Sequence, residues 1–305
     1  MADIVAIGEP LFEFNQVQGT TRYQQGFGGD SSNFVCAAAR VGASCAYLSR
    51  VGDEEFGRQL LALWRREGVD CSAVELDAVA PTGIYFVSHT ERGHEFSYRR
   101  AGSAACAMRF GAAFEAQVRG AKFLHLSGIS QAISPQACDC VFDAIRCARE
   151  HGVRISYDLN YRPKLWPPAR ARAIAEATLR DCDLFLPSVD EAGVLFGVNE
   201  AHELIDWAHR LGARNVAVKL GGKGALVSDG GRTEAIAGFP VDAIDATGAG
   251  DCFGGVLVAR LVAGDSLVDA ARAACAAAAL STTGFGAVDP LPGWERVHSL
   301  LKIGG

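Results

Sequence analysis

Several features that would assign this 305-residue sequence to a class of protein are missing from it. No C-x-x-C pair occurs among its 10 cysteines, so neither a zinc site nor a disulfide framework is indicated. We interpret these cysteines as small buried residues in a reducing compartment. Lys and Arg form no run longer than a pair, and the formal net charge is −6. This charge pattern disfavours nucleic acid and anionic membranes as partners.

Long apolar runs are also missing. The opening MADIVAIGEP has no basic region, and its apolar run ends at Gly8, too early for a signal peptide or a spanning helix. Hydrophobic residues make up 49% and charged residues 21% of the chain, as is usual for globular proteins. We therefore expect a cytoplasmic protein with no membrane partner.

What the sequence does contain is an alternation of short apolar runs with helix-length segments. The runs rich in strand-forming residues are 3–8, 45–52, 122–128, 153–160, 183–188, 215–222 and 224–230, and the helical segments include 31–42, 53–67, 134–151, 167–180 and 200–212. This alternation predicts an α/β fold with a mostly parallel central sheet and helices on both faces.

Two stretches break the alternation. Residues 10–27 and 82–100 are aromatic-rich and alternate between apolar and polar side chains, and 83–100 predicts a hairpin around an ERG turn at 91–93. We expect these stretches to form a small β-sheet lid on a single domain spanning 1–305. Exposed lid strands favour a homo-oligomer that buries them, for example a dimer through the lid.

The most informative motif is ATGAGDCFGG, residues 246–255. The amides of Gly248, Ala249, Gly250 and Asp251 would point outward at the N-terminus of a following helix, where an anion binds favourably. Glycines and an aspartate are also ordinary residues at a helix start. However, the helix contains two further glycines, each less favourable than alanine by about 0.8–1 kcal/mol, so we expect close packing against it.

An aspartate beside an anion site has a chemical explanation. Asp251 would accept the proton of a hydroxyl group while that hydroxyl attacks a phosphorus atom held by the amides. The motif therefore predicts phosphoryl transfer to an alcohol. The sequence contains neither G-x-x-x-x-G-K-[ST] nor G-x-G-x-x-G, which argues against a P-loop nucleotide binder and a dinucleotide-dependent dehydrogenase.

These residues also carry a resemblance to a known family. DATGAGDCF resembles the D-x-x-GAGD-x-F signature of the ribokinase-like carbohydrate kinases, also called the PfkB family, and GGDSSNFVCAAARVG with RVGDEEFGRQL resembles their N-terminal signature. Within this family the sequence is most similar to the 2-keto-3-deoxygluconate kinases, through AIGEPLFEF, YRRAGSAA, FLHLSGIS, DLNYRPKLW and VKLGGKGA. The resemblance implies a ribokinase-like fold and an ATP-dependent sugar kinase.

The resemblance also implies residue roles. Asp251 would be the general base, with Gly248, Ala249 and Gly250 forming the anion hole. The residues implied for the sugar are Gly28, Gly29 and Asn33 at its hydroxyls, Tyr85 and Tyr98 covering it from the lid, and Arg100 and Arg162 at its acid end. Two guanidinium groups suit a carboxylate better than a neutral sugar, although both arginines could instead be ion-paired or exposed.

For the nucleotide, the resemblance implies contacts from one hairpin and two helices. Lys219, Gly222 and Gly224 would line it, although the same residues fit a simple hairpin turn. Glu191 would act on magnesium through water, with Ser188 where the family has asparagine, and Cys275 would border the adenine. ATP and Mg²⁺ are the expected cofactors, and activation by K⁺ is left open.

The expected reaction is the ATP-dependent conversion of 2-keto-3-deoxygluconate to its 6-phosphate. The first alternative is a kinase for a neutral sugar such as fructose or ribose, in which Arg100 and Arg162 would be structural. The second is a non-catalytic sugar- or nucleotide-binding regulator, and the intact Asp251 and glycine-rich turn count against it.

Overall fold

The computed structural model describes residues 1–17, 19–90 and 93–303, in which the main sheet has eight strands. The strand order is β14-β13-β12-β11-β10-β9-β1-β4. All neighbours from β4 to β12 pair in parallel, whereas β12, β13 and β14 pair antiparallel. These strands are β1 (Ile4–Ile7), β4 (Cys45–Leu48), β9 (Phe123–Ser127), β10 (Arg154–Asp158), β11 (Leu184–Leu186), β12 (Asn215–Lys219), β13 (Gly224–Ser228) and β14 (Thr233–Ala237). The predicted mostly parallel α/β sheet is confirmed.

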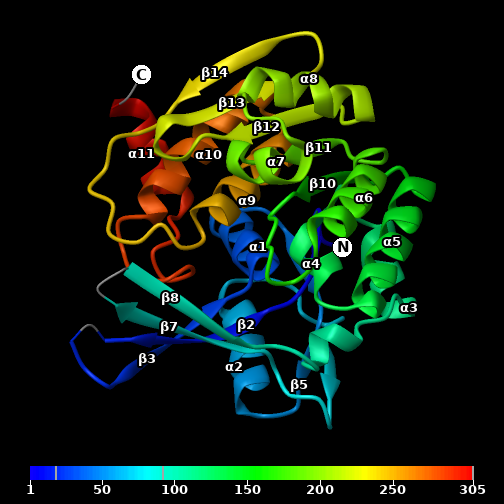
Figure 1. Ribbon diagram of the computed structural model, residues 1–305, viewed down its shortest axis with the longest axis vertical. Coiled ribbons are helices and arrows are strands. Elements are labelled where there is room, and N and C mark those ends of the chain that lie inside the picture. Colours follow the sequence, from blue (N-terminus) through cyan, green and yellow to red (C-terminus); the bar gives the residue numbers. More distant parts are fainter. Residues whose placement is uncertain (18, 91–92, 304–305) are drawn as a thin grey trace.

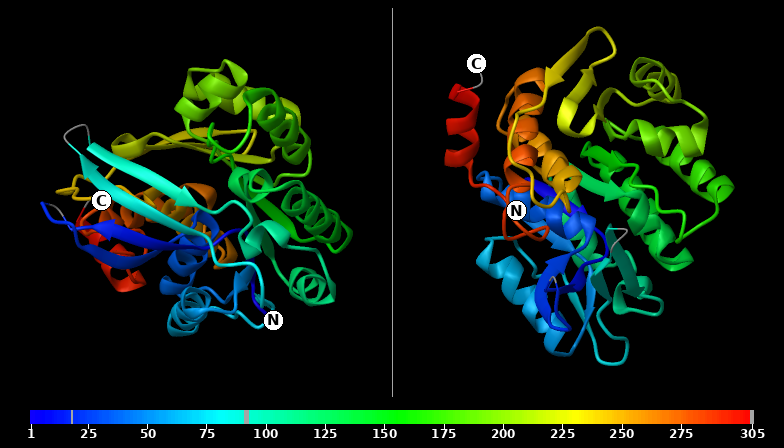
Figure 2. Two further views of the ribbon diagram at one scale, coloured as in Figure 1. Left: turned by 60° about the horizontal axis from the view of Figure 1, so that its bottom comes forward. Right: turned by 60° about the vertical axis from the view of Figure 1, so that its left-hand side comes forward.

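Helices cover both faces of this sheet (Figures 1 and 2). Strand β1 shows why, because Val5 and Ile7 belong to one hydrophobic core while Ile4 and Ala6 belong to the other. The helices are α1 (Asp30–Arg40), α2 (Glu55–Arg66), α3 (Ala112–Arg119), α4 (Gly128–Ala132), α5 (Pro135–Glu150), α6 (Pro168–Leu179), α7 (Val189–Phe196), α8 (Ala201–Leu211), α9 (Ala249–Val262), α10 (Leu267–Ser281) and α11 (Trp294–Ile303).

The predicted β-lid is a separate four-stranded sheet with the order β3-β2-β7-β8, seen at the lower left of Figure 1. Its strands are β2 (Leu11–Gln16), β3 (Tyr23–Gly28), β7 (Ile84–Thr90) and β8 (Gly93–Arg99). The outer pairs are antiparallel and β2 pairs with β7 in parallel, so the sheet is mixed. Residues 91 and 92 of the predicted ERG turn lie outside the described residues. The edge strands are β3 and β8, and a dimer through them stays a prediction.

One predicted strand is wrong in its extent. Residues 45–52 divide into β4 in the main sheet and β5 (Arg50–Gly52), which pairs in parallel with β6 (Glu75–Asp77) in a two-stranded sheet. The chain changes sheets at the buried Ser49, whose hydroxyl donates to the carbonyl of Gly8 at 2.7 Å. The next residue, Arg50, pairs with Asp77 at 2.9 Å, which stabilises the second sheet.

Close packing against α9, predicted from its glycines, is confirmed. A Cβ atom on Gly255 would lie 2.3 Å from the backbone oxygen of Phe34 in α1. On Gly254 it would lie 3.2 Å from a side-chain carbon of Leu186 in β11. The small residues therefore let α9 approach both α1 and the sheet, which fixes the start of α9 relative to the loops that precede α1.

Across the described ranges, no helix combines the length and apolar character required to cross a membrane.

Candidate active site

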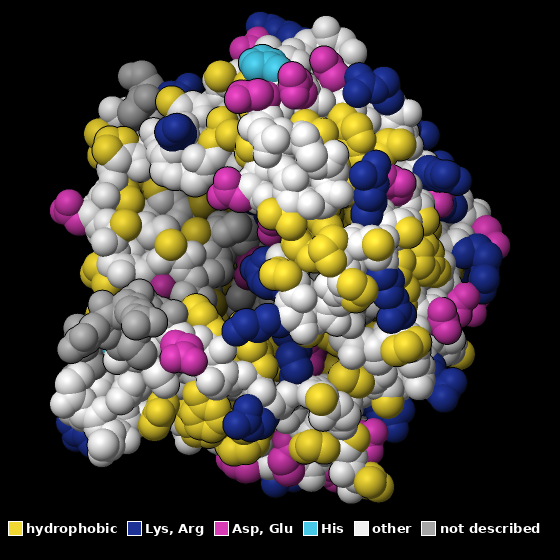
Figure 3. Space-filling view, in the orientation of Figure 1, with side chains coloured by type: hydrophobic (Ala, Val, Ile, Leu, Met, Phe, Trp, Pro, Cys, Tyr) yellow, Lys and Arg dark blue, Asp and Glu magenta, His cyan; other side chains and the backbone are white. Residues whose placement is uncertain are grey.

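Some of the predicted site residues lie between the main sheet and the lid, whereas Ser188, Gly222, Gly224 and Cys275 belong to the start of α7, the β12–β13 turn and α10. In Figure 1 the start of α9, the start of α1 and the lid strands surround one region, and the space-filling view shows a hollow there with Lys and Arg side chains along its rim (Figure 3). Strands β9 and β10 end at Ser127 and Asp158. Helix α4 and the loop that contains Asn160 continue from these carboxyl ends. A ligand site at the carboxyl ends of parallel strands is the general expectation for such sheets.

The glycine-rich turn begins α9 with Gly248 as its N-cap. Gly248 has a φ of 75°, and a Cβ atom there would lie 2.9 Å from the Cβ of Ala287. Thr247 does not cap the helix, because its hydroxyl donates to Asp245 at 2.6 Å. Of the three predicted anion-hole amides, that of Ala249 already donates to the carbonyl of Ala246 at 3.2 Å. The turn is therefore held from outside the helix, with Gly248 at its sharpest point.

Asp251 lies in the first turn of α9 and faces α1. Its carboxylate accepts a hydrogen bond of 2.8 Å from the side-chain amide of Asn33. Burial and the negative charge of Asp30 raise the pKa of Asp251 to about 8, while the Asn33 hydrogen bond opposes the rise. A carboxylate with such a pKa is a much stronger base than an exposed aspartate.

Asp30 is a site residue for which the sequence analysis gave no role. It is 8% exposed, accepts from the Ser127 hydroxyl and from the Asn160 amide at 3.0 Å, and therefore joins the starts of α1 and α4 to the end of β10. Asn160 has a φ of 39°, and among the described residues no other residue except glycine has a positive φ. The other oxygen of Asp30 has no hydrogen-bond partner within the described residues. The signal for Asp30 was its position directly after Gly28-Gly29.

Lys219 forms an ion pair with Asp158, with 2.7 Å from its Nζ to each carboxylate oxygen. Burial raises the pKa of Asp158 to about 6 although Lys219 opposes the rise. Burial disfavours the charged form of Lys219, but the carboxylates of Asp158 and Glu191 outweigh it and raise the pKa of Lys219. A Cβ atom on Gly250 would lie 3.6 Å from Nζ of Lys219, so this cation is next to the turn Gly248–Gly250, called the anion turn below after its predicted role. Asp158 is the last residue of β10, and within the strand-forming run 153–160 nothing distinguished it as a site residue.

The lid presents an aromatic face to the site. Tyr85 is buried, and its hydroxyl donates to Glu13 of the neighbouring strand. Tyr98 is 37% exposed and stacks on Tyr85 with 5.7 Å between ring centroids. A Cβ atom on Gly28 would lie 2.5 Å from the Tyr85 hydroxyl, which explains the need for glycine there. The Tyr85 ring is therefore close to Gly28, while its hydroxyl is already bonded within the lid.

The two predicted arginines differ in their surroundings. Arg100 is 12% exposed, pairs with the fully buried Glu9 and lies 5.4 Å above the Tyr98 ring. Arg162 is 49% exposed, donates to the Tyr161 carbonyl at 3.0 Å and lies 3.4 Å from Glu191. Burial raises the pKa of Tyr98, and the positive charges of both arginines oppose that rise. Arg100 therefore lies over the Tyr98 ring, and the charge of Arg162 acts on the Tyr98 hydroxyl as well.

Other predicted residues have clear structural roles. Ser188 is the N-cap of α7, and it exchanges hydrogen bonds with Glu191. Its hydroxyl oxygen accepts from the backbone amide of Glu191 at 3.4 Å. Gly224 has a φ of 103°, and a Cβ atom there would lie 2.0 Å from the backbone oxygen of Ile236. Gly222, in contrast, has no atom within 4 Å of its Cβ position, so the backbone beside it is open.

Cys275 is 6% exposed in α10, and burial raises the pKa of its thiol to about 12. It belongs to the hydrophobic core between α9, α10 and the sheet. The thiol is therefore protonated and packed, and any contact with adenine would be apolar.

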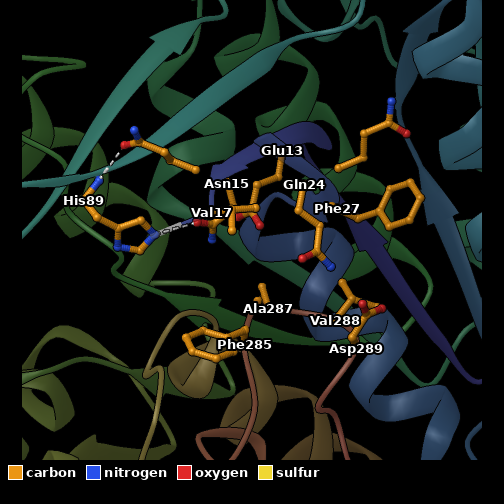
Figure 4. A pocket seen from close by; sticks show the side chains of 14 residues that line it. Glu13, Asn15, Val17, Gln24, Phe27, His89, Phe285, Ala287, Val288 and Asp289 are labelled. Carbon is orange, nitrogen blue, oxygen red and sulfur yellow. Dashed lines mark hydrogen bonds between the residues drawn. The ribbon is translucent and has the colours of Figure 1, made fainter. Parts of the chain in front are cut away.

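A cavity of about 290 Å³ lies under the lid, next to the Glu13 carboxylate (Figure 4). Asn15, Gln24 and His89 line it from the lid, and a loop with Phe285 and Ala287 lines the opposite side. Ala287 is the residue that contacts Gly248. The cavity thus adjoins both the lid face and the anion turn.

Comparisons with known proteins agree with this geometry. Residues 1–294 match the model of the pfkB family carbohydrate kinases. A 2-dehydro-3-deoxygluconokinase from Thermoproteus tenax is 36% identical over 315 residues, covering 99% of this chain and 95% of the relative. Fructokinase-2 from Solanum lycopersicum is 31% identical, with 99% and 96% covered. The crystal structure of fructokinase from Vibrio cholerae O395 with fructose, ADP and calcium is 28% identical, with a TM-score of 0.88 and coverage of 98% and 99%.

Proposed function

The chain belongs to the pfkB family of carbohydrate kinases, and from this premise we propose that it phosphorylates 2-keto-3-deoxygluconate on its 6-hydroxyl with ATP. The 2-dehydro-3-deoxygluconokinase from Thermoproteus tenax is named for this same sugar acid, under its other chemical name, and supports the choice.

The observation that carries the proposal is Arg100 over the Tyr98 ring, together with the positive charge of Arg162 that also acts on Tyr98. Arg100 follows the lid strand β8, and Arg162 belongs to the loop after β10. Arg162 is half exposed and shares its charge with Glu191 at 3.4 Å, a distance that leaves it available to another anion. A carboxylate is the anion that arginine binds in a bidentate manner. The acid end of the sugar would lie here.

The reacting hydroxyl would lie at the other end of the site, beside Asp251. Asn33 holds one oxygen of this carboxylate at 2.8 Å, which leaves the second oxygen for the hydroxyl proton. Because its pKa is raised to about 8, Asp251 holds the proton more strongly than an ordinary aspartate would. Asp251 is therefore the proposed general base. Gly28, Gly29 and Asn33 would bind the remaining hydroxyl groups, while the rings of Tyr85 and Tyr98 cover them.

Charge on the transferred phosphoryl group would be stabilised at the start of α9. The helix N-terminus and the turn Gly248–Gly250 form the proposed anion hole. Lys219 lies beside Gly250 and adds a positive charge, which it shares with the Asp158 carboxylate that fixes it in place. We propose that Lys219 contacts the nucleotide phosphates, with Gly222, Gly224 and the Cys275 region continuing the nucleotide site.

Glu191 is the residue near Lys219 that we propose for Mg²⁺. Mg²⁺ prefers few protein carboxylates and keeps several water ligands, and Glu191 offers a partly exposed carboxylate whose charge acts on both Asp158 and Lys219. Glu191 would hold the ion through water, as expected, while the capping role of Ser188 remains structural. When bound, the ion neutralises phosphate oxygens. The described residues contain no group of three or more His, Cys, Asp or Glu side chains that could hold a metal ion.

A specific observation favours the alternative substrate, a neutral ketose. Glu9 neutralises Arg100, and Glu191 lies 3.4 Å from Arg162, so each of the two arginines already has a carboxylate partner. The Vibrio cholerae fructokinase supports the same alternative, since it was solved with fructose.

The experiment that separates the two substrates is ADP production from ATP and Mg²⁺ with four acceptors at equal concentration. The acceptors are 2-keto-3-deoxygluconate, its galactose-derived epimer, fructose and ribose. We expect turnover of the keto acids to exceed that of fructose by at least tenfold, the least that one charge-assisted contact contributes. Faster turnover of fructose or ribose would replace the proposed substrate by a neutral sugar.

A further inference from the structure

Two glutamates from one short segment hold the side chains that the lid presents to the acceptor site. Glu13 accepts the hydrogen bond of Tyr85, and Glu9 pairs with Arg100. Between them Tyr85 stacks on Tyr98, and Arg100 lies over the Tyr98 ring. The segment 9–13 therefore holds Tyr85 at one end of this series of contacts and Arg100 at the other. The family resemblance assigned roles to the tyrosines and the arginine, but none to either glutamate.

Glu9 lies two residues after the end of the buried strand β1 and is 0% exposed. One of its oxygens accepts from Nη2 of Arg100, and the other accepts from the Ser103 hydroxyl at 3.2 Å. A carboxylate this deeply buried is tolerated only when a cation and hydrogen-bond donors satisfy it. Burial raises the pKa of Glu9, whereas Arg100 and Ser103 oppose the rise.

Arg100 is only partly satisfied by this pair. Its Nε is buried and has no hydrogen-bond partner within the described residues. Glu9 therefore satisfies Nη2 of the guanidinium group but leaves the Nε–H donor without an acceptor. The orientation of Arg100 depends on Glu9, because Tyr98 contacts only its face.

We propose that Glu9 is a positioning residue that fixes Arg100 and compensates its charge, and that it thereby sets how strongly the acceptor site prefers acidic over neutral sugars. This inference rests on the proposed function, because it places the acid end of the sugar at Arg100 and Arg162. A carboxylate bound to Arg100 shares the guanidinium group with the Glu9 carboxylate. The two negative charges repel each other across that group, whereas a neutral sugar meets no such repulsion. Glu9 therefore moderates the preference that the two arginines create.

The test replaces the charge and keeps the shape. Glu9→Gln retains an oxygen that accepts from Arg100, and it removes the negative charge. At pH 8 we compare kcat/KM for 2-keto-3-deoxygluconate with that for fructose, in wild type and variant. Removing the like charge should raise the ratio of acid to neutral sugar by about five- to twentyfold, mainly through a lower KM for the acid. An unchanged or lower ratio would overturn the proposal.

Two further variants keep the result interpretable. Glu9→Asp keeps the charge, so its acid-to-neutral ratio should stay within about twofold of wild type; a rise as large as that of Glu9→Gln would contradict the charge argument. Glu67→Gln is the matched control, because it breaks another buried ion pair, 2.7 Å to Arg40, in a glutamate that is 8% exposed. Arg40 lies about 15 Å along α1 from Asp30, so this variant should leave the ratio unchanged.

These measurements distinguish a folding defect of a variant from a change in its substrate preference. Each ratio is measured on one preparation, so the fraction of active protein cancels. Should Glu9→Gln not fold, Glu9→Ser leaves room for a water molecule at Arg100 and is measured by the same ratio. The wild-type ratio alone tests the proposed function: a preference for fructose would refute the sugar acid, while the change between wild type and variant still tests Glu9.

Discussion

The raised pKa of Asp251 predicts a steep pH dependence for the chemical step. Burial and the charge of Asp30 move this pKa from 3.8 to about 8. A general base works only when deprotonated, so about one tenth of the enzyme is competent at pH 7 and about nine tenths at pH 9. The rate of phosphoryl transfer should therefore rise about tenfold between these two pH values.

The assay is a single-turnover measurement with rapid quench, since product release can hide the chemical step. Asp251→Asn should lower the rate by about 10²–10⁴-fold, the range for a positioned general base, and should abolish the pH dependence. Asp269→Asn is the control, because Asp269 is an exposed aspartate in the first turn of α10. A wild-type rate that is flat from pH 7 to pH 9, or near-normal turnover by Asp251→Asn, would refute the assignment.

The same shift has a consequence for stability. A carboxyl group whose pKa is higher in the folded state retains its proton there while the unfolded chain has released it. The contribution of Asp251 to stability is therefore present below pH 3.8 and is lost as the pH rises to about 8. Asp251→Asn carries no such group, so its Tm should exceed that of wild type by a margin that grows across this pH range. A constant margin from pH 4 to pH 8 would contradict the raised pKa.

Three further predictions concern other parts of the site. Arg162→Ala should raise KM for the sugar acid by about tenfold or more and leave KM for fructose nearly unchanged, as measured by steady-state kinetics; equal losses would remove the carboxylate from Arg162. Gly255→Ala should destabilise the fold by about 1–3 kcal/mol in urea titration, because its Cβ would lie 2.3 Å from the α1 backbone, whereas Gly222→Ala has open space and should change stability by less than about 0.5 kcal/mol. Lys219→Met should destabilise by about 3–5 kcal/mol at pH 8, because it leaves the buried Asp158 unpaired, and the loss should shrink below pH 6 as Asp158 becomes protonated.

The fold was predictable because its signals are local. Buried parallel strands need continuous apolar runs, and the helices between them need apolar faces, so both patterns are present in consecutive residues. The one strand predicted with the wrong extent, 45–52, shows the limit of this reasoning. Both halves favour a strand, but the hydrogen bond from Ser49 to Gly8 turns the chain into a second sheet. Nothing within residues 45–52 indicates that partner.

The anion turn was predictable for a similar reason. Glycines at 248, 254 and 255 are unfavourable in a helix unless the backbone must turn sharply or another element must approach, and both conditions hold here. The catalytic role of the carboxylate beside this turn stays a prediction. In contrast, Ser188 stands where the family motif has asparagine, and only the structure shows that its hydroxyl caps α7.

The sequence by itself determined the sheet, the lid strands and the placement of Asp251 at a helix start, since these depend on residues that are neighbours along the chain. Tertiary structure alone decided which charged and polar side chains meet in the site. Asn33 contacts Asp251 across 218 positions, Glu9 meets Arg100 across 91, and Lys219 meets Asp158 across 61. The basicity of Asp251 and the charge compensation of Arg100 and Lys219 follow from burial and from such distant pairs. They arise only after the loops that follow several strands have been brought to one edge of the sheet.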